Sequence, residues 1–420
     1  MKRLFVLLLC VAGSMFLNTD AYASEPVVKT GIEVLRDRGF DVLKGKRVGL
    51  VTNPSGVDRN LCSTVDILFN APEVNLVALY GPEHGVRGDV YAGGKISDTV
   101  DETTGLTVFS LYGATRKPTQ EMLKGVDVMV YDIQDVGVRS YTFISTLGLV
   151  MEACSEAGVE VVVLDRPNPL GGNKIEGCLV EQPFNSFVSQ YRIPYVYGLT
   201  VGELAVMINE EGLNRGQKGD QEPVRCDLTV VPMKGWKRDM VYEDTKLPWV
   251  LPSPNIPFKD SPMYYAAAGV CGELYGFLNI GVGYTLPFQL FGATWIEPDA
   301  LKARLDSYNL PGVEFRTIWY KPISGSLKGQ LVKGLQYFFT DFEAARITET
   351  QFHVMQAIAE LYPDKKPFEV ADGVGLFDKV CGTDWIRNAF SKTYRFDTIK
   401  DYWRKDEKDL RTLSKKYHMY

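Results

Sequence analysis

The first half of the chain alternates short apolar runs with segments of helical periodicity. Continuous runs rich in Val, Leu and Ile cover residues 47–52, 74–80, 127–131 and 160–164. Helical periodicity covers residues 64–70 and 141–157, and the second segment stops at Gly158. Continuous apolar runs of this kind are typical of strands that are buried on both faces. The pattern therefore predicts an α/β fold with a Rossmann-like, doubly wound parallel sheet.

Shorter elements extend this first unit. Strands are predicted over residues 107–111 and 228–232, and a short helix is predicted over residues 119–123. Thr200 and Glu203 form a capping box that begins a helix over residues 201–211.

The pattern changes after residues 251–257, which contain three prolines. Residues 269–285 are rich in glycine and aromatic residues, and residues 312–320 and 330–340 are strand-like. Residues 350–361 have the pattern of a helix. A chain of about 400 residues is larger than one hydrophobic core usually serves. We therefore expect an α/β domain over residues 24–257 and a smaller α+β domain over residues 258–420.

Residues 1–23 have the features of a secretory signal peptide. A basic start at Lys2 and Arg3 precedes an apolar stretch, and Ala21, Tyr22 and Ala23 form a small-x-small cleavage site. We therefore expect an exported, periplasmic protein. The alternative is a lipoprotein anchored through Cys10, which would leave an unusually short apolar segment. No later stretch is predicted to span a membrane.

Charge and cysteine content narrow the function classes. The formal net charge is −6 without a basic cluster, which argues against a nucleic-acid partner. The six cysteines that remain after Cys10 are scattered and form no C-x-x-C pair, so the usual zinc spacing is missing. Disulfides are allowed in an exported protein, and isolated buried cysteines are an equal alternative.

Polar residues follow the second predicted strand, in the stretch Gly-Pro-Glu-His-Gly-Val-Arg. Glu83, His84 and Arg87 stand within five residues between glycines, and the chain has only three histidines. Because ligands bind at the carboxyl ends of parallel strands, these residues are candidates for a site. A partly desolvated Glu83 is suited to general acid catalysis, and the alternative is a carboxylate that caps a turn. His84 is expected either to contact a substrate or to be structural.

Similar clusters follow the other predicted strands and are expected at the same edge of the sheet. Their members are Asn53 after the first strand, Asp132, Gln134, Asp135, Arg139 and Tyr141 after the third, and Asp165, Arg166 and Asn168 after the fourth. The functional interpretation is that these side chains bind a polar ligand. The alternative is a set of ion pairs that fixes the loops.

Several motifs for other chemistry are missing. The sequence contains no dinucleotide-binding G-x-G-x-x-G after the first strand, no phosphate-binding G-x-x-x-x-G-K, no H-E-x-x-H and no G-x-S-x-G. We therefore expect no cofactor. With three histidines, a multi-histidine metal site is also not expected.

Five segments resemble the YbbC/NamZ-type exo-β-N-acetylmuramidase family, and they occur in family order across most of the chain. They are residues 51–56, 81–85, 131–137 with Arg139 and Tyr141, 164–169, and 252–257, which include Asn255. The resemblance implies a Rossmann-like domain, a smaller C-terminal domain and a cleft between them. It implies release of N-acetylmuramic acid from non-reducing ends of peptidoglycan fragments, with Glu83 as the main catalytic residue.

The chain departs from the family pattern before Pro287 and Phe288. The arginine of a family G-R-G stretch is replaced by Val282, so an anionic group of the substrate loses one expected partner. Glu273 and Asn279 are candidates to contribute there.

Glycoside hydrolysis usually needs a second carboxyl. Asp132 is our candidate for it, and Asp135, Glu273 or the substrate's acetamido group are alternatives. Alternative functions are a non-catalytic muropeptide-binding protein and an esterase or amidase that acts on cell-wall fragments.

Overall fold

The computed structural model describes residues 28–88, 99–113, 115–213 and 222–420. The predicted signal peptide and Cys10 lie outside these described residues.

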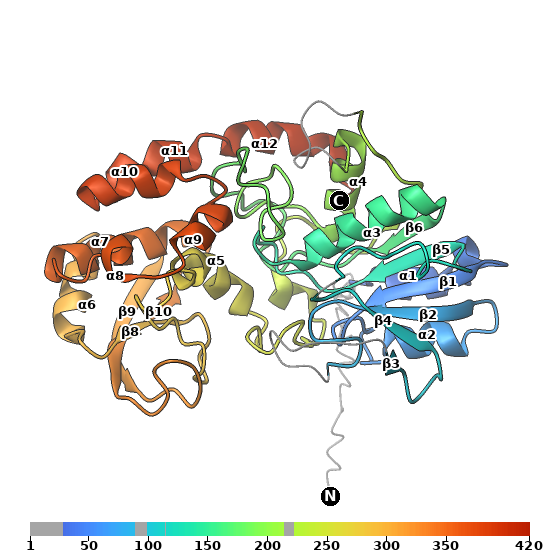
Figure 1. Cartoon of the computed structure of the whole chain (residues 1–420), viewed down its shortest axis with the longest axis horizontal. Coiled ribbons are helices and arrows are strands. Elements are labelled where there is room, and N and C mark those ends of the chain that lie inside the picture. The colour runs from blue at the N-terminus through green and yellow to red at the C-terminus, as the bar shows by residue number, and fades with distance from the viewer. Residues whose placement is uncertain (1–27, 89–98, 114, 214–221) are drawn as a thin grey trace, which may run out of the picture.

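A mostly parallel sheet forms the centre of the first unit (Figure 1). Within the described residues it has seven strands in the order β3-β4-β2-β1-β5-β6-β7. Their bounds are β1 (Arg47–Thr52), β2 (Asn75–Gly81), β3 (Thr99–Val100), β4 (Thr107–Ser110), β5 (Val128–Asp132), β6 (Glu160–Leu164) and β7 (Leu228–Val231). Only the β3–β4 pairing is antiparallel. Strands β2 to β4 are added on one side of β1, and strands β5 to β7 are added on the other side. This order confirms the prediction of a doubly wound sheet.

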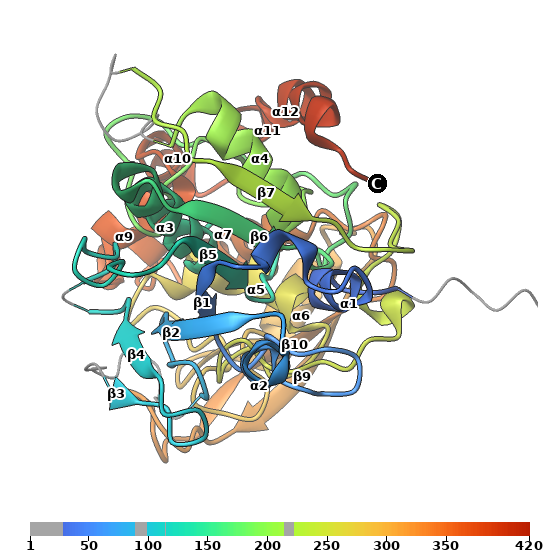
Figure 2. The ribbon, with the colours of Figure 1, turned by 90° about the vertical axis from the view of Figure 1, so that its right-hand side faces the viewer.

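Helices cover both faces of this sheet (Figure 2). On one face, α1 (Gly31–Asp37) and α2 (Thr64–Asn70) pack against alternate strand residues such as Leu50 and Val130. On the other face, α3 (Phe143–Ala157) and α4 (Val201–Glu211) pack against the residues between them, such as Val51 and Tyr131. Burial of both faces is the physical reason for the continuous apolar runs in the sequence.

Most predicted elements of this unit match the structure within two residues. The predicted helix over residues 119–123 is wrong, because those residues form turns that end at Gly125 with a φ of 82°. One hydrogen bond of helical type forms there, from Leu123 N–H to the Thr119 carbonyl at 3.1 Å. Helix formation needs several consecutive bonds to offset its nucleation cost, and five residues supply too few.

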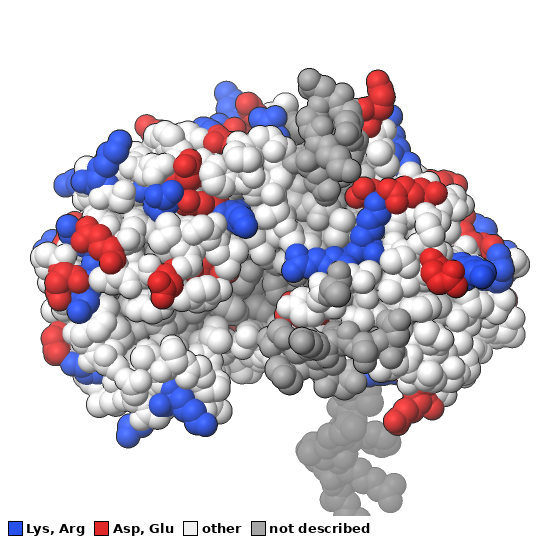
Figure 3. All heavy atoms as spheres, in the orientation of Figure 1, with Lys and Arg blue, Asp and Glu red and all other residues white. Residues whose placement is uncertain are grey.

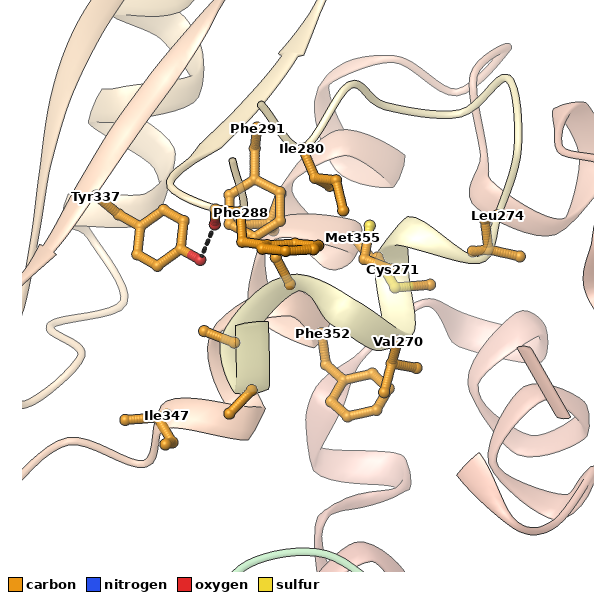
Figure 4. Packing of buried hydrophobic residues seen from close by; sticks show 14 of the residues in the cluster. Val270, Cys271, Leu274, Ile280, Phe288, Phe291, Tyr337, Ile347, Phe352 and Met355 are labelled. Carbon is orange, nitrogen blue, oxygen red and sulfur yellow. Dashed lines mark hydrogen bonds between the residues drawn. The ribbon is translucent and has the colours of Figure 1, made fainter. Parts of the chain in front are cut away.

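The second unit is smaller and combines an antiparallel sheet with helices, as predicted. Among the described residues its sheet has the order β8-β10-β9, with bounds β8 (Leu290–Ala293), β9 (Val313–Tyr320) and β10 (Val332–Phe339). The helices are α5 (Ser261–Gly272), α6 (Pro298–Asp306), α7 (Thr350–Leu361), α8 (Pro367–Val370), α9 (Val374–Cys381) and α10 (Trp385–Thr393). Figure 4 shows α5 inside the core, with Phe291, Phe352 and Met355 packed around it.

The end of the chain returns to the first unit. Helices α11 (Lys400–Arg404) and α12 (Glu407–Leu413) run from the second unit back over the first (Figure 1). There the Tyr417 hydroxyl donates to Glu211, and the Tyr420 hydroxyl donates to Asp165 at 2.6 Å. Short 3-10 helices complete the described structure at Asp41–Leu43, Tyr242–Thr245, Ile347–Glu349, Phe396–Thr398 and Ser414–Tyr417.

Two further findings concern membranes and thiols. No helix within the described ranges is long and apolar enough to cross a membrane. All six cysteines outside the signal segment are free thiols, of which Cys62 is exposed and Cys154, Cys178, Cys226, Cys271 and Cys381 are buried.

Candidate active site

A cavity of about 200 Å³ lies where the two units meet. It is lined by Glu83, His84, Ser140, Tyr141, Thr142, Phe143, Ser253, Asn255, Ile256, Tyr265 and Phe288. Figure 3 shows the molecule hollowed between its two lobes, with acidic and basic side chains interspersed over both. The cavity thus brings together four of the predicted site residues, namely Glu83, His84, Tyr141 and Asn255.

Glu83 is placed at the cavity by the turn that ends β2. The turn is closed by a hydrogen bond from Gly85 N–H to the Pro82 carbonyl at 3.0 Å. It is tight, because a Cβ atom at Gly81 would lie 3.2 Å from the Gly85 Cα. Glu83 is half-buried, and its carboxylate accepts a hydrogen bond from Tyr112. Burial and this hydrogen bond raise the pKa of Tyr112 to about 12, so the phenol remains a donor to Glu83 at neutral pH.

Two lining residues have a left-handed backbone that favours glycine. His84 has a φ of 77° and is buried, and Phe288 has a φ of 65°. Such backbone strain persists only where the surrounding structure fixes it, and it gathers at functional sites. One strained residue comes from each unit, so both units contribute to the same cavity wall.

The connection from β5 to α3 forms another wall. The Ser140 hydroxyl lies 3.0 Å from the Tyr265 hydroxyl of α5 and donates to the Tyr195 hydroxyl at 3.2 Å. Burial raises the pKa of both Tyr141 and Tyr265, so their phenols are uncharged at neutral pH. The wall therefore offers neutral hydroxyl groups next to aromatic rings.

Asp132, the predicted second catalytic group, does not line the cavity. Its carboxylate is fully buried and accepts from Arg166 Nη2 at 2.9 Å and from the Thr64 hydroxyl at 2.5 Å. A buried ion pair of this kind fixes the loops after β5 and β6. The catalytic role of Asp132 and the substrate contact of Arg166 remain predictions without support from this geometry.

Asp135 and Gln134 lie next to Asp132 and are also buried. One oxygen of Asp135 accepts from Gly137 N–H at 2.8 Å and from the Tyr197 hydroxyl, while the other has no hydrogen-bond partner among the described residues. Burial raises the pKa of Asp135 to about 6. The Gln134 amide donates to the carbonyls of Asp135 and Pro167.

Three further predicted site residues form hydrogen bonds that stabilise the fold. The Arg139 guanidinium is fully buried and donates to backbone carbonyls, including Val380 and Cys381 at 2.8 Å each. The Asp165 carboxylate accepts from the Thr200 hydroxyl, from Gly202 N–H and from the Tyr420 hydroxyl. The Asn168 amide donates to the Leu199 carbonyl at 2.8 Å.

The remaining predicted residues lie around the cavity and do not line it. The Asn53 amide donates to the Pro252 carbonyl at 3.1 Å and thereby anchors the proline-rich loop that carries Asn255. Arg87 is paired with Asp66 and Asp101.

On the second unit, Glu273 follows α5 and is half-buried, and burial raises the pKa of its carboxyl. Asn279 accepts from Tyr320 at 2.7 Å and donates to the carbonyl of Val282 at 3.1 Å. Asn279 thus holds the loop that contains Val282.

Sequence reasoning missed several lining residues, of which Ser140, Thr142, Ser253, Tyr265 and Phe288 carry the most chemistry. Ser140 and Thr142 flank Tyr141, which was predicted to be a site residue. Their position next to it could have identified them as lining residues. Tyr265 belongs to α5, a helix that periodicity did not predict. Within the described ranges, no group of three or more His, Cys, Asp or Glu side chains is arranged to hold a metal ion.

Comparison with known proteins identifies relatives over most of the chain. The chain is 44% identical over 398 residues to the peptidoglycan β-N-acetylmuramidase NamZ of Bacillus subtilis, covering 95% of this chain and 92% of that protein.

Two solved structures of DUF1343 family proteins from Bacteroides fragilis are also similar. One has a TM-score of 0.88 at 53% identity and the other a TM-score of 0.74 at 27% identity. Each alignment covers 94% of this chain and 99% of the relative.

Family models match both units. The N-terminal model of exo-β-N-acetylmuramidase NamZ matches residues 48–260, and the C-terminal model matches residues 263–420. This chain therefore belongs to the exo-β-N-acetylmuramidase NamZ family.

Proposed function

We propose that the chain is an exo-acting glycoside hydrolase that releases N-acetylmuramic acid from the non-reducing ends of peptidoglycan fragments. The observation that carries this proposal is Glu83, a half-buried carboxyl that lines the cavity between the two units. A cavity of about 200 Å³ suits one sugar residue, which fits release of single sugars from a chain end.

Glu83 acts as the general acid in this proposal. It protonates the oxygen of the glycosidic bond while the bond to the sugar breaks, and the sugar passes through an oxocarbenium-like transition state. The hydrogen bond from Tyr112 fixes the carboxyl before substrate binds. General acid catalysis of this kind typically contributes a factor of about 10² to 10⁴ in rate.

The second catalytic group is not one of the carboxyls that are buried and hydrogen-bonded within the fold. Among Asp132, Asp135 and Glu273, the first two are at most 5% exposed and bonded within the first unit. Glu273 is half-buried and accepts from Tyr275 at 3.3 Å. Either Glu273 or the acetamido group of the substrate is therefore favoured over Asp132.

The described lining residues carry no Lys or Arg side chain. N-acetylmuramic acid carries a lactyl carboxylate, and Val282 stands where the sequence resemblance leads us to expect an arginine. We infer that the carboxylate is held by neutral donors such as Thr142 and Asn255. Export to the periplasm and a role in cell-wall recycling belong to this proposal and rest on the signal-like residues 1–23.

Mass spectrometry of the products tests the proposal, because each alternative breaks a different bond. The full chain is incubated with a muropeptide whose non-reducing end is N-acetylmuramic acid. Appearance of the free sugar supports the exo-muramidase. Release of a peptide or of an acyl group would instead identify an amidase or an esterase, and binding without any product would identify a non-catalytic muropeptide-binding protein.

A further inference from the structure

Phe288 occupies a backbone position that a phenylalanine rarely adopts. Its φ is 65°, in the left-handed region where glycine is favoured and large side chains are strained. Glycine or asparagine would adopt this backbone at lower cost. A phenylalanine at such a position points to a use for its ring.

Hydrogen bonds on both sides hold Phe288 in this conformation. The Tyr337 hydroxyl donates to the Phe288 carbonyl at 2.5 Å, as Figure 4 shows. Next to it, Gln289 N–H donates to the Leu286 carbonyl at 3.2 Å, and the Gln289 carbonyl accepts from Tyr337 N–H at 3.3 Å. β10 therefore fixes the backbone of the loop that carries Phe288, and with it the point from which the ring projects.

The ring of Phe288 ends a series of aromatic rings along the cavity. Phe143 packs edge-on against Tyr141 at 5.0 Å between ring centroids, Tyr141 against Tyr265 at 5.6 Å, and Tyr265 against Phe288 at 5.0 Å. All four residues line the cavity together with Glu83. The cavity thus has an aromatic wall that spans both units, with the carboxyl of Glu83 among its polar lining residues.

We propose that Phe288 is a specificity-determining residue of the second unit, whose ring packs on the apolar face of the sugar bound beside Glu83. The inference rests on the proposed function, because that function supplies the sugar. A pyranose ring presents C–H groups on one face and hydroxyl groups at its edge, which matches an aromatic wall beside polar donors. Contact with an aromatic ring buries those C–H groups away from water.

The test separates the ring from the backbone. The variants F288G and F288N keep the left-handed backbone and remove the ring, whereas F288Y keeps the ring. The matched control is F291L, because Phe291 is fully buried in the same core, stacks on Tyr337 and does not line the cavity. For each variant, kcat and KM are measured with a muramic-acid glycoside, and binding of free N-acetylmuramic acid is measured by calorimetry.

We expect F288G and F288N to raise KM and the Kd for N-acetylmuramic acid by about tenfold, with kcat within about threefold of wild type. F288Y and F291L keep both constants within about threefold, although F291L lowers thermal stability. If wild type releases the sugar and both ring-deleting variants keep its KM and Kd, this inference is wrong and the proposed function stands. If wild type neither releases nor binds the sugar, the proposed function fails and this inference fails with it.

Discussion

At the scale of single residues, Asp165 shows how a residue at a strand exit can serve the fold. Its fully buried carboxyl accepts from Thr200, Gly202 and Tyr420 at 2.6–2.7 Å. Burial raises the pKa of Asp165 from 3.8 to about 6, and these hydrogen bonds lower it only in part. The folded state therefore binds this proton more tightly than the unfolded state. The stability that this proton contributes is full below pH 4 and is lost as the pH rises to about 6.

The substitution D165N tests this sign, because asparagine cannot ionise and keeps one oxygen acceptor for Gly202. The free energy of unfolding of wild type should fall relative to D165N by about 2 to 3 kcal/mol between pH 4 and pH 7. Urea unfolding at the two pH values measures the difference. The exposed Asp41, whose pKa is lowered by Arg38, provides the control: D41N should not reproduce this fall. Identical pH dependence of D165N and wild type would contradict the account.

At the scale of elements, Arg139 joins the loop that leads to α3 to the end of α9. Its guanidinium donates to the carbonyls of Cys178, Ile193, Val380 and Cys381 at 2.6–2.8 Å. The last two are the final carbonyls of α9, which intrahelical bonds leave free and whose partial negative charge suits a cation. Arg139 therefore holds the wall residues Ser140 and Tyr141 against the second unit.

Replacing Arg139 by methionine should destabilise the fold, because several buried carbonyls lose their donor. We expect a loss of about 3 kcal/mol or more in the free energy of unfolding, measured with guanidinium chloride. The exposed Arg38, paired with Asp41, is the control, and R38M should cost less than about 1 kcal/mol. If R139M is as stable as wild type and loses only substrate binding, Arg139 contacts the substrate, as its motif predicts, and is not needed for the fold.

The elements themselves were predictable to different degrees. β1, α2, β6, α4 and α7 have the predicted bounds, because apolar runs, helical periods and capping residues marked them. α5 was missed because its sequence, Ser-Pro-Met-Tyr-Tyr-Ala-Ala-Ala-Gly-Val-Cys-Gly, is apolar on most sides, so a buried helix there shows no amphipathic period. That omission also hid Tyr265, which lies on α5.

The site was predictable only in part, because sequence indicates the edge of the sheet where it lies but not the contacts that each side chain makes there. The parallel sheet brings polar residues to one edge, and Glu83, His84 and Tyr141 reach the cavity as expected. Sequence cannot show which polar side chains at that edge form hydrogen bonds within the fold, as those of Asp132 and Asn168 do. The left-handed backbone of Phe288 depends on contacts with a distant strand, β10, and has no local signal.

At the scale of the whole molecule, the last residues of the chain fasten the second unit to the first. Met419 N–H donates to Glu203 at 2.9 Å, and the Tyr420 hydroxyl donates to Asp165 at 2.6 Å. The Tyr420 ring also packs edge-on against Trp236 at 5.1 Å. None of these residues lines the cavity.

Deleting residues 418–420 should therefore lower the stability of the fold and leave the catalytic activity nearly unchanged. We expect a loss of about 2 to 4 kcal/mol in the free energy of unfolding, from one lost aromatic contact and unsatisfied buried acceptors. At a temperature where the shortened chain remains folded, its kcat/KM should stay within about threefold of wild type. A shortened chain with unchanged stability would show that the tail does not fasten the units.

In the proposed mechanism Glu83, held by Tyr112 in a cavity built by both units, donates the proton that cleaves the glycosidic bond. The most direct test measures kcat/KM for release of N-acetylmuramic acid by wild type and by E83Q, which keeps the shape of the side chain and cannot give up a proton. If Glu83 is the general acid, kcat/KM for E83Q should fall by a factor of about 10² to 10⁴ while substrate binding is retained. An E83Q protein that releases the sugar at the wild-type rate would contradict it.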